Sequence, residues 1–216
     1  MRSFILLLRK ARFFLVPLAI FLLISGTFLL LYKKEAIHLS INQFHSSFGD
    51  KIMPFITLLG DGWTITIFCL LVFAYDRRFG LYTGISCLGA SGITQALKHT
   101  IFYGEARPAW VFRDNHNLRF VPGVEMNYFD TFPSGHTTVS FAFFFCLSFL
   151  VKNNWLRFAC FFIALMIGYS RIYLSQHFLN DVFGGSIVGT LTSLLILTLV
   201  VHFGGMKKSP LAPIEY

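Results

Sequence analysis

Six long apolar stretches divide this 216-residue chain and constrain its fold more than any other feature. A helix that crosses a membrane needs about 20 mostly apolar residues. Charged residues make up only 13% of the chain, against about 25% in ordinary soluble domains. We therefore predict an all-α integral membrane protein, a six-helix bundle that forms one domain over residues 1–216. The expected spans are Phe13–Leu31, Ile52–Tyr75, Phe79–Phe102, Ser134–Val151, Trp155–Leu174 and Phe178–Phe203.

The distribution of basic residues predicts how this bundle is oriented. Six crossings place both termini on one side, and basic residues gather in cytoplasmic segments. Ten of the eighteen Lys and Arg residues fall on the side of the termini and eight on the other. The bias becomes clear if some of those eight serve a site at the outer face. We therefore expect cytoplasmic termini, in a bacterial inner membrane. The first stretch is longer than the about 7–15 apolar residues of a signal peptide, so we interpret it as a retained helix.

The distribution of charge argues against nucleic-acid binding, and the spacing of the cysteines argues against metal binding. The net charge of +8 does not indicate nucleic-acid binding, because the basic residues lie between the apolar runs rather than in one patch. The four cysteines lie inside apolar stretches with no metal-binding spacing, and we expect buried thiols.

Asp61 interrupts the second stretch. We interpret it as a local helix break, with a position facing the site as the alternative.

Three polar clusters lie at the outer ends of the predicted spans. The fourth span runs inward and the fifth returns, so His136 and His177 reach the same membrane level although they are 41 positions apart. A long polar loop, Tyr103–Pro133, joins the third and fourth spans on this side, and loops of that length are usually functional or mobile. We expect the clusters to meet at one outer-face site. They are Lys98 with Arg107-Pro108, Pro133-Ser134-Gly135-His136, and Ser170-Arg171 with His177 and Asp181.

This combination of residues suits phosphoryl transfer. Lys98, Arg107 and Arg171 supply three positive charges, and arginine can hold phosphate oxygens with two hydrogen bonds. Ser134 and Gly135 begin a predicted helix, where free backbone N–H groups form an anion cradle. These five residues are our candidate substrate-binding set.

Two histidines and a carboxylate are our candidate catalytic residues. His177 and Asp181 are four positions apart, so a helix places them on one face. The carboxylate can hold the imidazole tautomer and leave the other ring nitrogen to attack phosphorus. His136 remains as a general acid for the leaving oxygen. No cluster of carboxylates suited to Mg²⁺ accompanies them, so we expect no metal or other cofactor, with charge neutralisation by the basic side chains.

At these residues the chain resembles the type 2 phosphatidic acid phosphatase (PAP2) family, which shares its site with vanadium haloperoxidases and bacterial acid phosphatases. The family motifs Pro-Ser-Gly-His and Ser-Arg-x5-His-x3-Asp match in sequence and spacing. The first motif departs from the commonest form, because eight residues rather than six separate Lys98 from Arg107. The motif core covers residues 98–181, and the six-span plan fits the membrane branch of the family.

The resemblance implies a mechanism that agrees with the reading of the residues. His177 would form a phosphohistidine supported by Asp181, and His136 would protonate the leaving group. The expected partners are a lipid phosphate or pyrophosphate at the outer leaflet and the surrounding membrane lipids; candidates are undecaprenyl pyrophosphate, phosphatidic acid, phosphatidylglycerol phosphate and lipid A. A lipid phosphotransferase, a vanadate-dependent haloperoxidase, and a non-catalytic lipid-binding or transport relative are the alternatives. The oligomeric state stays open.

Overall fold

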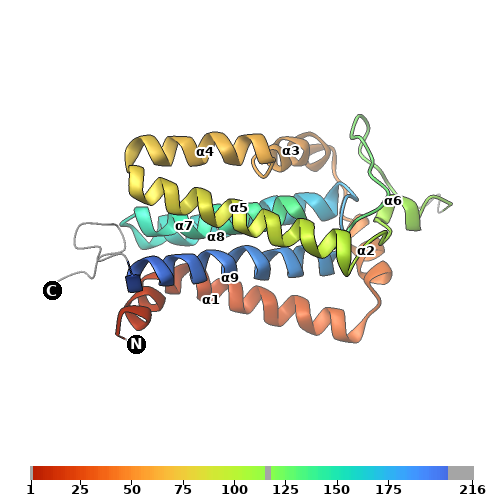
Figure 1. Cartoon of the computed structure of the whole chain (residues 1–216). Helices are drawn as coiled ribbons and strands as arrows, with labels where there is room; N and C mark the ends of the chain where they lie inside the picture. The colour runs from red at the N-terminus through yellow and green to blue at the C-terminus, as the bar shows by residue number, and fades with distance from the viewer. Residues whose placement is uncertain (1, 115–117, 204–216) are drawn as a thin grey trace.

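The chain folds into helices connected by short turns and one long loop (Figure 1). The computed structural model describes residues 2–114 and 118–203, and within these ranges there are nine helices and no strand. The all-α prediction is confirmed. The helices are α1 (Arg2–Leu31), α2 (Lys34–Asn42), α3 (Ser47–Leu58), α4 (Gly62–Tyr75), α5 (Arg77–Thr100), α6 (Pro108–Val111), α7 (Gly135–Leu150), α8 (Asn154–Tyr173) and α9 (Leu179–Phe203).

Several of these helices have the length and hydropathy of membrane spans. Leu7–Leu31 within α1, the whole of α8 and the whole of α9 meet both criteria. Helices α3 and α4 meet them together, as a pair bent by 55° at a short break. The protein is therefore an integral membrane protein. Helix α7 is apolar but shorter, with 16 residues, and α5 has 24 residues.

The break between α3 and α4 lies where the sequence placed an interruption in the second span. Asp61 caps α4, because its carboxylate accepts a hydrogen bond from the Trp63 N–H at 2.8 Å. A Cβ atom on the neighbouring Gly60 would lie 2.4 Å from Ile167 Cγ2 of α8. Glycine therefore allows the break to pack directly against the bundle, and the interpretation of Asp61 as a local helix break is confirmed.

Phenylalanine rings fill the centre of the bundle. Phe14 of α1 is fully buried and makes edge-to-face contacts with Phe141 and Phe145 of α7 and Phe161 of α8, with centroid distances of 6.1, 5.3 and 5.7 Å. Such pairs are favoured by the ring quadrupole beyond the area they bury. The first helix is thus an integral part of the core.

Small residues bring α7 and α9 into close contact. A Cβ atom on Gly185 would lie 2.8 Å from the carbonyl oxygen of Ser134, and one on Gly189 would lie 2.2 Å from that of Thr138. Glycine at such positions lets helix backbones approach closely in membrane proteins. This approach places the beginning of α9 directly beside the beginning of α7.

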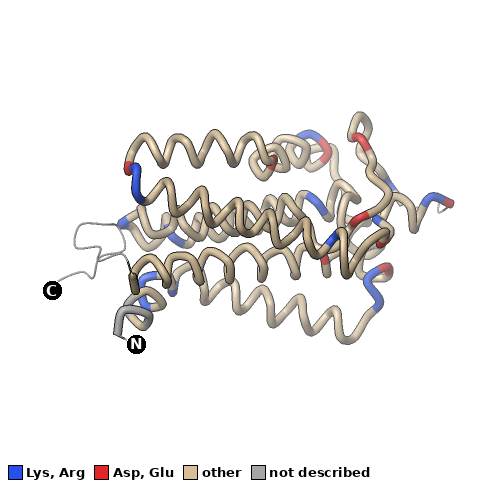
Figure 2. The backbone as a smooth tube through the Cα atoms, in the orientation of Figure 1, with Lys and Arg blue, Asp and Glu red and all other residues tan. Residues whose placement is uncertain are grey.

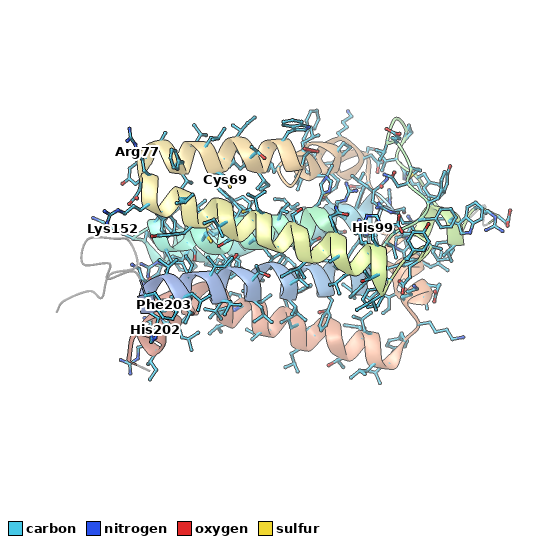
Figure 3. The ribbon with its side chains drawn as sticks, in the orientation of Figure 1. Cys69, Arg77, His99, Lys152, His202 and Phe203 are labelled. Carbon is cyan, nitrogen blue, oxygen red and sulfur yellow. The ribbon has the colours of Figure 1, made fainter. Side chains whose placement is uncertain are left out.

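The two ends of the bundle differ. Helices α2 and α6, neither of which was expected from the sequence, lie at one end with the long loop, whereas α1 begins at the other (Figure 1). Charged residues gather at the two ends and are sparse along the middle (Figure 2). Arg77 and Lys152 lie at the end where α1 begins, and His99 lies toward the opposite end (Figure 3).

Candidate active site

The predicted site residues lie at the end of the bundle that carries α2 and α6. Five helices position them, and each residue occupies a helix terminus or the turn beside it. Helix termini leave backbone N–H and C=O groups without intrahelical partners, so this end is rich in polar groups. The residues are Lys98 in the last turn of α5, Arg107 before α6, Ser134, Gly135 and His136 at the start of α7, Arg171 in the last turn of α8, His177 before α9, and Asp181 in its first turn.

His177 and Asp181 form a buried pair. The side chains are 2% and 0% exposed, and His177 Nδ1 lies 3.2 Å from Asp181 Oδ2. The backbone N–H of His177 donates to the Arg171 carbonyl at 3.1 Å, which fixes the turn before α9. The four-residue spacing therefore brings the imidazole and the carboxylate into contact through Nδ1, and Nε2 is the ring nitrogen that Asp181 does not engage.

The surroundings of His177 favour a neutral imidazole. Burial lowers the pKa of His177 well below its ordinary value, and the nearby charges of Arg107, Arg171 and Lys98 lower it further. A neutral ring that donates through Nδ1 carries a lone pair on Nε2, which is the form that a nucleophile requires.

Lys98 and Arg107 converge on one carbonyl group. Lys98 Nζ donates to the Asp130 carbonyl oxygen at 2.8 Å, and Arg107 Nη2 approaches the same oxygen at 3.5 Å. Arg107 is also held by the carbonyl of Phe129, which accepts from Nε at 2.7 Å. The eight-residue separation in the first motif therefore still brings both cations together. Burial lowers the pKa of Arg107, while Asp181 and Asp130 oppose that effect.

Arg171 is held from two sides, and one of its buried donors has no hydrogen-bond partner among the described residues. Nη1 donates to Thr57 Oγ1 at 2.7 Å, and Nη2 approaches Gln176 Oε1 at 3.5 Å. Its buried Nε has no hydrogen-bond partner among the described residues. Thr57 lies at the end of α3, so the broken second span contributes directly to the position of this arginine.

The start of α7 differs in one detail from the expected anion cradle. The Ser134 N–H is not free, because it donates to the Asp181 carbonyl at 3.0 Å. The Ser134 hydroxyl caps the helix by accepting from the Thr137 N–H at 3.4 Å and from its hydroxyl at 2.9 Å. A Cβ atom on Gly135 would meet open space. The Ser134 N–H is therefore not available for the predicted anion cradle.

His136 is half-buried in the first turn of α7, next to the cationic cluster. It interacts electrostatically with Arg171, His177, Arg107 and Lys98. His99, the neighbour of Lys98 in the sequence, is exposed, whereas Lys98 is buried. The rotation of about 100° per residue in an α-helix explains the difference.

Three further residues support this site and were not predicted from the sequence. The Thr131 hydroxyl donates to Asp181. Arg171 donates to the hydroxyl of Thr57 and approaches the side-chain oxygen of Gln176. Gln176 also ties the loop to the site, because its Nε2 donates to the Glu125 carbonyl at 2.9 Å. Neutral side chains in loops and at helix ends carry no periodic signal, and only the three-dimensional packing identifies them.

Comparison with known proteins assigns the chain to a family. The PAP2 superfamily profile matches residues 79–204. Undecaprenyl-diphosphatase BcrC of Bacillus subtilis is 30% identical over 158 residues, which cover 70% of this chain and 75% of that protein. A lipid A 1-phosphatase of Rhizobium johnstonii is 31% identical over 140 residues, 64% of this chain and 54% of that protein.

A solved structure supports the same assignment. The PAP2-type phosphatidylglycerolphosphate phosphatase of Bacillus subtilis is 25% identical and superposes with a TM-score of 0.65, over 87% of this chain and 96% of that one. LpxE of Aquifex aeolicus shares the fold, with a TM-score of 0.66, 23% identity, and coverage of 76% and 93%. The chain therefore belongs to the PAP2 superfamily.

Proposed function

We propose that this protein is a metal-independent membrane phosphatase that removes phosphate from a lipid phosphate or diphosphate at the outer leaflet. The observation that carries the proposal is the buried His177–Asp181 pair, which holds Nδ1 of His177 beside the carboxylate while three cationic side chains lie close enough to lower the pKa of the ring. The named relatives are phosphatases of undecaprenyl diphosphate and lipid A, and both of these substrates carry phosphate on a lipid.

The chemistry follows from the positions of the two histidines. Nε2 of His177 attacks phosphorus while Asp181 holds the Nδ1–H, and the bond between phosphorus and the leaving oxygen breaks. His136 gives its proton to that oxygen. Water then attacks the phosphohistidine, with His136 accepting the proton, so that phosphate is released and His177 is restored.

Charge stabilisation in this mechanism comes from side chains and the helix N-terminus. Lys98, Arg107 and Arg171 neutralise the phosphate oxygens, and the free Nε of Arg171 is one donor that the protein leaves for them. The Gly135 amide and the Ser134 hydroxyl contribute at the start of α7.

A groove in the bundle supports a lipid substrate. Helices α4 and α5 enclose an apolar cavity of about 700 Å³. Asp61, beside the break, and Val139, one turn along α7 from His136, both line it. A hydrocarbon chain in this groove would leave its phosphate at the level of His136.

We infer that the chain crosses the membrane six times, with α3 and α4 as one broken span and α5 and α7 completing the set. We infer that both termini, which six crossings put on one side, lie in the cytoplasm of a bacterial inner membrane and that the site lies at the outer face. The basic residues Arg77, Arg78 and Lys152 between spans support this orientation, because positive charge favours cytoplasmic connections.

Phosphate release from purified protein in detergent tests the proposal. The substrates are undecaprenyl diphosphate, phosphatidic acid, phosphatidylglycerol phosphate and lipid A, each with EDTA. We expect release from at least one lipid, its loss in His177→Asn, and full activity in the matched control His99→Asn. Activity that EDTA abolishes, or that survives in His177→Asn, would overturn the mechanism. Transfer of phosphate to a lipid acceptor instead of water would identify a phosphotransferase.

A further inference from the structure

A buried threonine outside the three motifs contacts both members of the catalytic pair. Thr131 belongs to the loop before α7 and is completely buried. Its hydroxyl donates a hydrogen bond to Asp181 Oδ2 and lies 3.3 Å from His177 Nδ1. Side chains from two loops and α9 therefore meet at one carboxylate oxygen.

Two hydrogen bonds fix the backbone at Thr131 and at the residue before it. Its own N–H donates to the Glu105 carbonyl at 3.2 Å. The preceding residue, Asp130, has a positive φ of 56°, and its carbonyl accepts from Lys98 at 2.8 Å. The same short segment thus holds a phosphate-binding cation and a hydroxyl that reaches the catalytic carboxylate.

The hydrogen bonds at Asp181 specify the protonation of His177. Oδ2 accepts from the Phe178 N–H at 2.9 Å and from Thr131, and His177 Nδ1 lies 3.2 Å away. The Thr131 hydroxyl has one hydrogen, which is directed to Oδ2, so its oxygen can only accept from His177. Both neighbours of Nδ1 are then acceptors, and the ring hydrogen is held on Nδ1.

We propose that Thr131 is a positioning residue that holds the Asp181 carboxylate and fixes the tautomer in which Nε2 of His177 carries the lone pair. This inference rests on the proposed function. In the transfer step, the Nε2–P bond forms, the P–O bond breaks and the leaving oxygen takes a proton from His136. The Thr131 hydroxyl keeps its proton throughout and touches no reacting atom.

Substitutions at Thr131 separate the hydroxyl from the shape of the side chain. Thr131→Val keeps the shape and removes the hydroxyl; Thr131→Ser keeps the hydroxyl and removes the methyl group. We expect valine to lower kcat about 10- to 100-fold, because a hydrogen bond to a charged group is lost, with KM within about twofold. We expect serine to restore kcat to within about threefold of the wild-type value.

A matched control removes a comparable hydroxyl elsewhere. Thr94 is buried in α5, one helical turn before Lys98, and its hydroxyl donates to Thr138 Oγ1 of α7 at 3.1 Å. Thr94→Val should leave kcat unchanged. Rates are normalised to active sites counted by the burst of phosphoenzyme, so that partial misfolding does not imitate a slower step.

The comparison also has a second pair of variants. If Thr131→Val does not fold, Thr131→Ser and Thr131→Ala still differ by one hydroxyl, and alanine should be about 10-fold or more slower than serine. Equal kcat in valine, serine and wild-type proteins, or in alanine and serine, would overturn the positioning role. Failure of the wild-type protein to release phosphate would instead contradict the proposed function itself.

Discussion

The two halves of the bundle are stabilised by different interactions. Around Phe14, Phe141 and Phe145, apolar rings pack edge to face, and shape decides the fit. At the other end, His177 and Asp181 are equally buried but depend on specific donors and acceptors. Removing ring volume from a packed apolar core costs stability because a cavity is left, whereas the polar groups at the other end hold side chains in the geometry that the proposed reaction needs. Substitutions in the two halves should therefore affect different properties, stability in one and turnover in the other.

The largest expected effect is a loss of turnover at the polar end without a loss of stability, and the apolar half should show the reverse. His177→Asn should reduce turnover by about 1,000-fold or more, because a nucleophile is lost, while the melting temperature changes little. Phe145→Leu should lower the melting temperature and leave kcat nearly unchanged. Lipid phosphate release and the thermal exposure of the buried thiols Cys146 and Cys160 measure these two properties. A Phe145→Leu protein that melts normally but has lost turnover would contradict the division.

The second effect concerns Arg171, the cation that Thr57 and Gln176 hold. Arg171→Lys should lower kcat/KM about 100-fold, because lysine cannot reproduce the planar guanidinium that contacts Thr57 and that we propose to bind the phosphate. Steady-state kinetics on the best lipid substrate checks this. Thr57→Val, which only loosens the same arginine, should have a smaller effect in the same direction. A larger loss in Thr57→Val than in Arg171→Lys would show that Thr57 acts in another way.

The third effect tests the close approach of α7 and α9, which connects the two halves. Gly189→Ala places a Cβ atom 2.2 Å from the Thr138 carbonyl and should destabilise the protein by about 1–3 kcal/mol, measured as a lower melting temperature. The matched control is Gly84→Ala in α5, where a Cβ atom meets nothing within 4 Å. Alanine favours a helix over glycine, so this variant should melt at the same or a higher temperature. Equal melting of both variants would contradict the packing argument.

The smallest effect is a pH dependence of stability at the polar end. His38 of α2 is buried, with Nε2 3.2 Å from Ser175 Oγ, and burial lowers its pKa to about 4. The unfolded chain binds a proton near the ordinary value of about 6.5, so the unfolded state binds more protons between those pH values. Stability should therefore fall as the pH decreases from about 6.5 to 4. Circular dichroism melts of His38→Phe should show a shallower decline; an unchanged slope would exclude His38 as the cause.

Sequence patterns were sufficient for the all-α class, and they named charged residues and histidines that the structure brings to one end of the bundle. The apolar stretches predicted an all-α membrane protein, and the structure confirms that architecture class. Hydropathy did not predict α2 or α6, because short helices at the bundle end have no long apolar run. The bond from the Ser134 N–H to the Asp181 carbonyl was also missed. It depends on how closely α7 and α9 approach, which is a property of packing rather than of spacing in the sequence.

The most direct test of the central claim is to trap the covalent intermediate. Wild-type protein is mixed with ³²P-labelled lipid phosphate, quenched in alkali within milliseconds, and digested to identify the labelled peptide by mass spectrometry. We predict a label that is stable in alkali, labile in acid, and attached to His177, with none in His177→Asn. A label on any other residue, or rapid turnover with no labelled protein at any time, would contradict the account.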